Sequence, residues 1–361
     1  TQRIYEVARS TGKPAFHVET EEELDLDALA HFRQVGVTAG ASTPNWQIKK
    51  VCRALESAPY RRVTGWRRTL YRFQRGLLLT NLYVALGAGG LSYASMQLQG
   101  LHHFLPHGLV AMLYVLSMHL LNHLTGGEAD RYNDPGRANF YQRYKRPLAV
   151  MALAGGAGGL GIAMGAGPLP FGLLLVMSLL GLSYNLNILP AFVSGGRYRR
   201  IKDIPGSKTF LIAAAWGLVT AVMPALSENG RIGPDTLAAL VWTVGLVFGR
   251  TAFFDLLDMQ GDRLVGRETL PIVLGAKRAM HLLKLSLVLL IVLPVLTSAL
   301  GLSTSLGYFL VIIPTSMLVV ITSFERGKLM PGARLEFLTE SHFILAGIIS
   351  FVWAVITIGH P

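Results

Sequence analysis

Two groups of acidic residues stand at the ends of apolar stretches, and their spacing suits a metal site. One group is Asp255, Asp258 and Asp262, in the stretch "DLLDMQGD". Spacings of three and four residues place these carboxylates on one face of a helix. Like charges on one face repel, so the pattern predicts a bound cation, and Mg²⁺ is the natural candidate for oxygen ligands. A solvated acidic helix end is the alternative interpretation.

The other group follows an earlier apolar stretch, in "NHLTGGEADRYND". It contains Asn122, Glu128, Asp130 and Asp134. Mg²⁺ usually takes one or two carboxylates and completes its shell with water and phosphate oxygens. Because Lys and Arg surround both groups, we expect the groups to hold a diphosphate between them through Mg²⁺. A solvated helix end is the alternative here too.

The composition indicates that membrane helices position these groups. Of the 361 residues, 51% are hydrophobic and 15% are charged, whereas soluble proteins carry about 25% charged residues. From residue 76 onward the chain is a series of apolar runs, each long enough to cross a bilayer. We expect nine membrane-spanning helices, at about 76–97, 104–122, 147–165, 169–189, 209–226, 235–254, 280–300, 305–323 and 341–358.

The net charge of +12 could bind a nucleic acid or an anionic membrane surface, and the distribution of the charge along the chain favours the membrane. Lys and Arg concentrate in alternate loops, and the opposite loops carry only Arg231. This bias predicts a multi-pass protein of the cell inner (cytoplasmic) membrane, with its N-terminus cytoplasmic and its C-terminus outside. Residues 59–75 are interpreted as a basic amphipathic linker at the lipid headgroups rather than a nucleic-acid patch.

Residues 1–58 are polar and mixed in composition, unlike the apolar runs that follow. "PAFHVE" and "QVGVTAG" favour strands between helical stretches, so we expect a small α/β fragment, too short to be a whole domain. The single cysteine, Cys52, excludes a disulfide within the chain. No signal peptide opens the sequence, and its start at Thr1 suggests that it begins within a longer protein.

Weaker motifs are left open. His119 and His123 are spaced as zinc ligands can be, but zinc lacks a third ligand. Asn185 and Asn187 are candidate acceptor-site residues in an apolar run.

Residues 70–358 resemble the UbiA superfamily of intramembrane prenyltransferases. Its motifs are Asn-x-x-x-Asp-x-x-x-Asp after span two and Asp-x-x-Asp-x-x-x-Asp after span six. "DLLDMQGDRLVGRETLPIVLG" matches the second motif and its tail. In the first motif Gly126 stands where an Asp is expected, which removes one Mg²⁺ ligand. Glu128 or Asp134 is a candidate replacement.

The resemblance implies a prenyltransferase domain at 76–358 that moves a polyprenyl group from its diphosphate to a small-molecule acceptor. It implies catalytic roles for Asp130, Asp255 and Asp258, and Mg²⁺ ligands at Asn122, Glu128, Asp130, Asp255, Asp258 and Asp262. It implies diphosphate binding by Arg131, Arg137, Tyr198, Lys202, Lys208 and Arg263, although the charge bias of the loops also explains these cations. A non-catalytic protein that binds prenyl lipids or acts as a scaffold is the alternative. A transporter is disfavoured because no internal repeat is seen.

Residues 1–57 resemble the C-terminal end of 4-hydroxy-3-methylbut-2-enyl diphosphate reductases, the LytB/IspH family, most specifically in "GVTAGAST" at 36–43. The resemblance implies a vestigial diphosphate-binding role for Ser42. The family's iron–sulfur cluster needs three cysteines upstream, so we expect no iron–sulfur cluster and no reductase activity from this chain. Part of a reductase–prenyltransferase fusion in isoprenoid metabolism is the simplest interpretation, and a docking remnant is the alternative.

Overall fold

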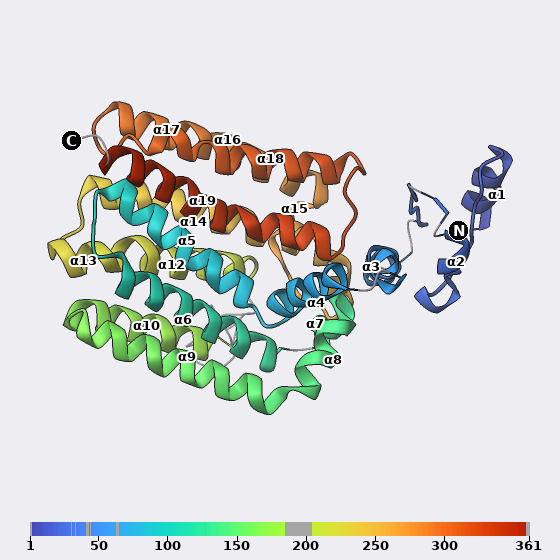
Figure 1. Cartoon of the computed structure of the whole chain (residues 1–361), viewed down its shortest axis with the longest axis horizontal. Coiled ribbons are helices and arrows are strands. Elements are labelled where there is room, and N and C mark those ends of the chain that lie inside the picture. The colour runs from blue at the N-terminus through green and yellow to red at the C-terminus, as the bar shows by residue number, and fades with distance from the viewer. Residues whose placement is uncertain are drawn as a thin grey trace.

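The computed structural model describes the chain apart from residues 1, 30, 33, 41–42, 44, 63–64, 127, 185–203 and 359–361. The side chains of residues 45–46, 58–62, 67, 128–130 and 358 are also not described. The described chain is an apolar helical bundle that carries a small N-terminal segment at one end (Figure 1).

The N-terminal segment consists of helical pieces joined by irregular chain. They are α1 (Gln2–Ser10), the 3₁₀ turn η1 (Glu21–Glu23), α2 (Leu26–Leu29) and α3 (Asn45–Arg62). The predicted α/β fragment is not confirmed, because no strand forms among the described residues of 14–19 and 34–40. A strand needs a neighbour with which to exchange backbone hydrogen bonds, and about 60 residues leave these stretches without one.

The bundle follows from residue 66. Its first half comprises α4 (Trp66–Leu79), α5 (Leu82–Gln99), α6 (Phe104–Leu124), α7 (Glu128–Asn133), α8 (Pro135–Arg143), α9 (Lys145–Gly165) and α10 (Pro168–Ser183). Its second half comprises α12 (Ser207–Gly217), the π-helical turn η3 (Leu218–Val222), α13 (Met223–Asn229), α14 (Pro234–Leu264), α15 (Leu270–Leu274), α16 (Ala276–Ala299), α17 (Gly307–Leu310), α18 (Ile312–Glu325) and α19 (Ala333–Ile358).

Seven helices of the described chain are long and apolar enough to cross a membrane, and an eighth is gained if a bent pair counts as one span. The count of nine is therefore not confirmed. The predicted span 76–97 is broken, because α4 and α5 meet at an angle of 73°. Asn81 at this bend has a left-handed backbone, which asparagine tolerates. The predicted span 169–189 is represented by α10, a shorter apolar helix as far as it is described.

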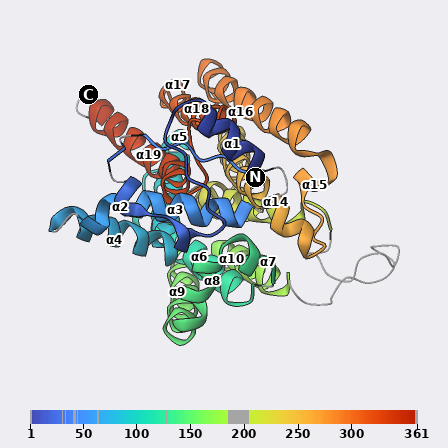
Figure 2. The same cartoon turned by 90° about the vertical axis from the view of Figure 1, so that its right-hand side faces the viewer.

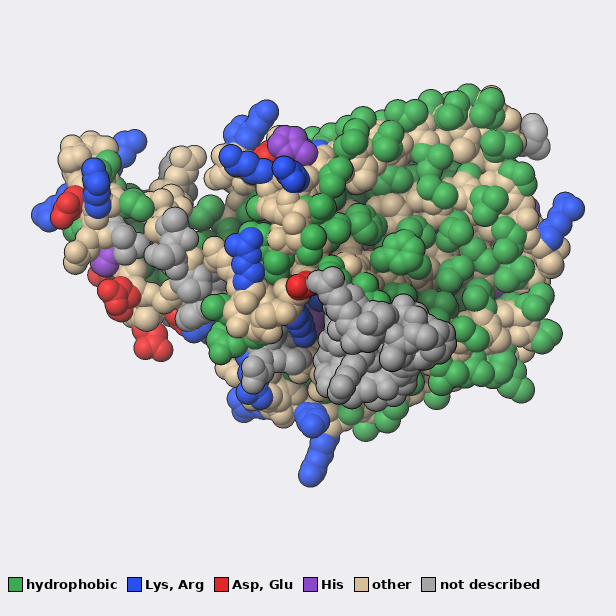
Figure 3. Space-filling model, turned by 180° about the vertical axis from the view of Figure 1, so that it is seen from behind, with side chains coloured by type: hydrophobic (Ala, Val, Ile, Leu, Met, Phe, Trp, Pro, Cys, Tyr) green, Lys and Arg blue, Asp and Glu red, His purple; other side chains and the backbone are tan. Residues whose placement is uncertain are grey.

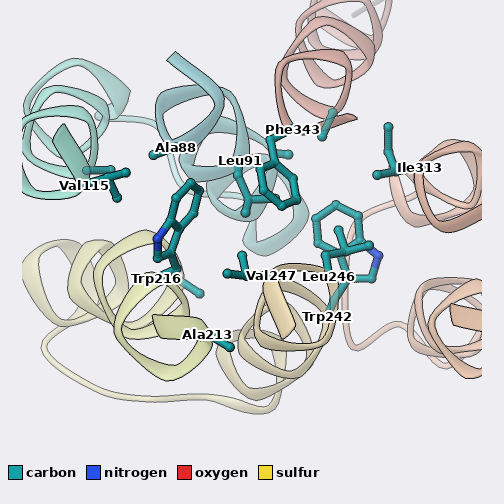
Figure 4. Close-up of a cluster of buried hydrophobic side chains, with 14 of the residues drawn as sticks. Ala88, Leu91, Val115, Ala213, Trp216, Trp242, Leu246, Val247, Ile313 and Phe343 are labelled. Carbon is teal, nitrogen blue, oxygen red and sulfur yellow. The ribbon is translucent and has the colours of Figure 1, made fainter. Parts of the chain in front are cut away.

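Glycines allow the helices to approach closely where α5 crosses α19. A Cβ atom at Gly347 would lie 2.6 Å from Cα of Gly90, so neither residue has room for a side chain there. Without a hydrophobic force between helices in lipid, such close packing supplies much of the attraction. Between these helices and α14, the large side chains of Trp216, Trp242 and Phe343 fill the core (Figure 4).

The outside of the bundle is apolar, whereas Lys and Arg gather towards the end that carries the N-terminal segment (Figure 3). A soluble protein rarely exposes so continuous an apolar surface. On α4 the apolar side chains of Trp66 and Phe73 are 70% and 61% exposed, as suits a helix at the headgroup boundary. Helix α3 lies across the same end of the bundle and contacts α7, α14 and α19 (Figure 2).

Candidate functional site

A cavity of about 420 Å³ lies at the end of the bundle that α3 covers. Its lining comes from α3, α6, α8, α12, α14 and α19, so segments far apart in the sequence meet around it. A smaller cavity of about 60 Å³ adjoins it and shares Asn122, Gly126, Lys208 and Asp255 with it. Residues of both acidic motifs therefore line these two neighbouring cavities.

The second acidic motif forms a row along α14. Asp255 is 5% exposed and lines both cavities, and its Oδ2 accepts a hydrogen bond from the hydroxyl of Thr209 on α12. Asp258 lines the larger cavity and Asp262 the smaller one. The helical repeat explains the row, because positions three and four residues apart lie above one another on one face.

The first acidic motif is held against this row by α7. Nδ2 of Asn133 donates a hydrogen bond to Oδ1 of Asp262 over 3.1 Å. A Cβ atom at Gly261 would lie only 1.9 Å from Oδ1 of Asn133, so glycine is required for this close approach. Asn122 lies in the last turn of α6 and lines both cavities. The structure thus brings the two motifs to the same end of the bundle.

Several predicted site residues lie outside the described part of the structure. Tyr198, Lys202 and the reductase-like Ser42 belong to segments that are not described, as do Asn185 and Asn187. Glu128 and Asp130 lie on α7, but their side chains are not described either. Their predicted roles stay predictions.

The predicted diphosphate-binding cations have different surroundings. Lys208 lines both cavities and Arg131 lines the larger one. Arg137 also lines the larger cavity, but its guanidinium already binds Glu336. Arg263 is exposed and lines neither cavity, because one residue beyond Asp262 the helix has turned by about 100°. Arg267 lies there instead, with Nη1 4.0 Å from Oδ1 of Asp262.

A buried ion pair in the lining of the larger cavity was not predicted. Arg250 of α14 donates to Oε1 of Glu340 on α19 through Nε, at 3.0 Å, and through Nη2. Glu340 is 2% exposed, and its second oxygen has no hydrogen-bond partner in the part of the chain that the structure describes. Ionisable residues within apolar spans usually have a function, so Glu340, just before the predicted span 341–358, carried a usable signal.

Helix α3 contributes two further cations that the sequence did not reveal. Nζ of Lys49 lies 2.5 Å from Oδ1 of Asp258. Arg53 binds the carboxylate of Asp134 through both terminal nitrogens, at 2.5 and 2.7 Å. Both cations come from the reductase-like segment, so their spacing gave no reason to connect them with the membrane domain.

The partners of Asp134 define its role. Its Oδ1 accepts a hydrogen bond from the backbone N–H of Arg137 and so caps the N-terminus of α8. Burial alone would raise the pKa of Asp134, but the hydrogen bond and charge of Arg53, with the charge of Arg137, hold it well below its usual range. This carboxylate is fully engaged, which argues against Asp134 as the ligand that replaces the missing Asp at Gly126.

The oxygen atoms of the cavity can provide part of the coordination shell of Mg²⁺. Among the described side chains, no three of the His, Cys, Asp or Glu type converge to enclose a metal ion. Mg²⁺ does not need such a cage, because it commonly binds one or two carboxylates together with waters and substrate phosphates. Asp255 and Asp258 supply hard oxygen atoms at the cavity wall, with Lys208 close by in the lining. The residues therefore fit a metal that arrives with a phosphate ligand.

Comparison with known families decides the identity of the bundle. Residues 82–356, most of the chain, match the UbiA prenyltransferase family. This chain belongs to the UbiA prenyltransferase family. We call the matched part the UbiA domain, and it contains both acidic motifs and all the helices from α5 to α18.

Solved structures share the fold of the UbiA domain. A UbiA homologue from Aeropyrum pernix in its apo form has a TM-score of 0.57 and 14% identity, covering 76% of this chain and 98% of that one. A UbiA homologue from Archaeoglobus fulgidus, bound to GPP and Mg²⁺, has a TM-score of 0.52 and 15% identity over the same shares. At such identities the similarity establishes the fold alone.

The segment before the UbiA domain has a different origin. Residues 1–56 match the LytB protein family. Over 57 residues the chain is 47% identical to 4-hydroxy-3-methylbut-2-enyl diphosphate reductase from Oleidesulfovibrio alaskensis, which is 16% of this chain and 20% of that protein. The chain thus spans about a fifth of the length of this relative, and α3 continues to Arg62, beyond the match.

Proposed function

We propose that the UbiA domain transfers a polyprenyl group from its diphosphate to a small-molecule acceptor at the membrane, with Mg²⁺ as cofactor. The observation that carries the proposal is the single cavity lined by Asp255 and Asp258 of one acidic motif and by Asn122 of the other. It lies at the charged end of an apolar bundle, where a diphosphate can stay near water while its prenyl chain enters the bundle.

Each side chain of the cavity has a proposed task. Asp255, Asp258 and Asp262, with Asn122, Glu128 and Asp130 of the first motif, would hold Mg²⁺, which when bound supplies positive charge to the diphosphate. Lys208 and Arg131 bind diphosphate oxygens directly, and Tyr198 and Lys202 join them. Arg137, already bound to Glu336, is better assigned to positioning α8. Preorganised charge on a leaving group in a water-poor site is a large catalytic contribution.

The aromatic and aliphatic part of the lining suits the other half of the reaction. As the carbon–oxygen bond to the diphosphate breaks, positive charge develops on the allylic carbon. Phe254, Tyr141 and Ile212 line the cavity and limit the access of water that would capture this cation. The acceptor then supplies the electron pair for the new bond and releases a proton. The A. fulgidus homologue bound to GPP and Mg²⁺ supports the same class of donor here.

Diphosphate release tests the proposal. Purified protein with Mg²⁺, a labelled polyprenyl diphosphate and a lipid extract as the source of acceptor should release diphosphate and form a prenylated product. Asp258→Asn and Asp262→Asn should reduce turnover at least about a hundredfold, as loss of a transition-state contact does. Asp235→Asn is the matched control, because Asp235 lies in the first turn of the same helix, at its other end. Equal turnover in all three variants would refute the assignment.

Gly126 favours a second candidate, a non-catalytic protein that binds prenyl lipids or acts as a scaffold. Gly126 lines both cavities where the family motif has an Asp. Such a protein would bind a prenyl diphosphate without releasing diphosphate, so measuring binding and turnover on one preparation separates the two candidates.

We also propose that the charged end faces the cytoplasm, with the C-terminus outside, in the inner membrane. The gathering of Lys and Arg at the end bearing α3 supports this orientation (Figure 3). A protease should remove an epitope at the N-terminus from inverted vesicles and leave it intact in spheroplasts.

The segment before α4 would be part of a reductase–prenyltransferase fusion in isoprenoid metabolism. Comparing lipids of cells with and without the gene by mass spectrometry would identify the acceptor.

A further inference from the structure

Helix α3 presents one face to the UbiA domain. Lys49, Cys52, Arg53 and Glu56 are spaced at three, four and seven residues, which places them on one side of a helix. Cys52 is buried, and Oε2 of Glu56 accepts a hydrogen bond of 3.0 Å from the backbone N–H of Ala333, at the start of α19. The reductase-like segment is therefore docked by a specific face.

Two of these contacts anchor α3 to the UbiA domain. Arg53 binds Asp134 at the start of α8, and Glu56 binds the start of α19. A Cβ atom at Gly332 would lie 2.6 Å from Oε1 of Glu56, so the chain before α19 fits closely against α3. Helix α3 is thereby fixed across the end of the bundle (Figure 2).

One turn of α3 before Arg53, Lys49 reaches into the cavity. Its side chain is 14% exposed, and its ammonium contacts Asp258, a carboxylate of the second acidic motif. The adjacent Lys50 points elsewhere, with Nζ 3.0 Å from Oε1 of Glu21 in the N-terminal segment. Of these two neighbouring lysines, Lys49 therefore contacts the site, whereas Lys50 contacts the N-terminal segment itself.

We propose that Lys49 is a diphosphate-binding residue of the UbiA domain, supplied by the reductase-like segment. Before substrate binds, its ammonium neutralises Asp258. Asp258 would be a ligand of Mg²⁺ when the metal is bound, and the ammonium of Lys49, on its flexible four-carbon chain, would then be free to bind an oxygen of the diphosphate. Lys49 has this role only if the cavity binds a prenyl diphosphate, which is the proposed function.

This assignment gives the reductase-like segment a task that needs no reductase chemistry. Its helix α3 contributes one cation to the diphosphate, Lys49, and a second cation, Arg53, to docking. It also adds the ammonium of Lys49 to a cavity that Lys208 of α12 lines as well, so that a diphosphate would meet cations from two helices.

The test compares Lys49→Met with Lys50→Met in the full chain. Methionine keeps most of the apolar length of lysine and removes its charge. Calorimetry with inorganic pyrophosphate and Mg²⁺ should show binding weakened about tenfold in Lys49→Met, the loss expected for one charge-assisted hydrogen bond. KM for the prenyl diphosphate should rise similarly, whereas Mg²⁺ alone should bind no more weakly. Lys50→Met should match the wild type, and Lys49→Arg should recover most of the affinity.

Two results would overturn the proposal. If Lys49→Met and Lys50→Met bind pyrophosphate equally well, Lys49 does not touch the diphosphate. If Lys49→Met instead turns over faster at low Mg²⁺ with unchanged pyrophosphate affinity, Lys49 of α3 competes with the metal for Asp258 and does not bind the diphosphate. A wild-type protein that binds pyrophosphate through Lys49 but releases none from a prenyl diphosphate would refute the proposed function and leave the Lys49 site intact. Unfolding temperatures show that each variant is folded.

Discussion

Asn133 and Asp262 are joined by a hydrogen bond of 3.1 Å, although 129 positions separate them in the chain. Asn133 ends α7, the helix that carries the first acidic motif, and Asp262 is the last carboxylate of the second. Gly261 leaves the space in which the amide of Asn133 lies. This contact joins the two motifs directly.

Replacing Gly261 with Ala should therefore reduce turnover. The new Cβ would fall 1.9 Å from Oδ1 of Asn133, so this side chain must turn away and release Asp262. Displacing groups at a site by about 1 Å can cost about a hundredfold in rate. In an ordinary helix interior, Gly→Ala stabilises by about 0.5–1 kcal/mol, so a loss of activity without a fall in unfolding temperature would identify the contact.

Asn133→Ala serves as the partner of this variant. If both substitutions act through the same hydrogen bond, the double variant should be no worse than either single one. Effects that multiply in the double variant would show that the residues act independently, and the contact would lose its assigned role.

Arg250→Met should destabilise the bundle strongly. It leaves Glu340 buried without its cation, and breaking a buried pair in this way costs about 3–5 kcal/mol of unfolding free energy. Denaturant titration in detergent measures the loss. Arg250→Met with Glu340→Leu removes both charges and should recover most of it, because an apolar pair needs no compensating charge. A double variant as unstable as the single one would show that Glu340 is not the group left unpaired.

Gly126→Asp should lower the Mg²⁺ concentration needed for half-maximal turnover, by about tenfold if the new carboxylate becomes a ligand. Gly126 lines both cavities beside Asn122, so the added carboxylate enters the space where the metal is proposed. Turnover measured across a range of Mg²⁺ concentrations decides this. An inactive wild type and an active variant would favour a decayed site, whereas high activity with Gly126 in place would exclude the non-catalytic alternative.

Stability should fall as the pH drops below about 4, partly through Asp134. Its pKa lies well below its usual value because the charges of Arg53 and Arg137 outweigh the opposing effect of burial. A carboxylate with a lowered pKa stabilises the fold above its unfolded pKa of about 3.9 and loses this contribution as protons bind. Asp134→Asn should therefore unfold at a lower temperature than the wild type at pH 7, and the gap should narrow towards pH 3. If the difference in unfolding temperature stays constant from pH 7 to pH 3, other groups cause the loss of stability in acid.

The sequence by itself determined the features that depend on local pattern. Apolar runs predicted the helices because a backbone in lipid must satisfy its own hydrogen bonds. The three- and four-residue spacing of Asp255, Asp258 and Asp262 predicted their common face, since the helical repeat is a local property. The motifs of the UbiA family and the LytB-like stretch were likewise evident, and the comparisons confirm both.

Tertiary structure alone decided which distant elements of the chain come into contact. Lys49 and Asp258 are 209 positions apart, and nothing local to either indicates the contact. Strands predicted in the N-terminal segment failed because a strand depends on a neighbour. The first predicted span bends at Asn81, whose side chain donates a hydrogen bond to Tyr141 on α8. Periodicity records which face of a helix is buried, whereas the partner of that face is set by packing over the whole chain.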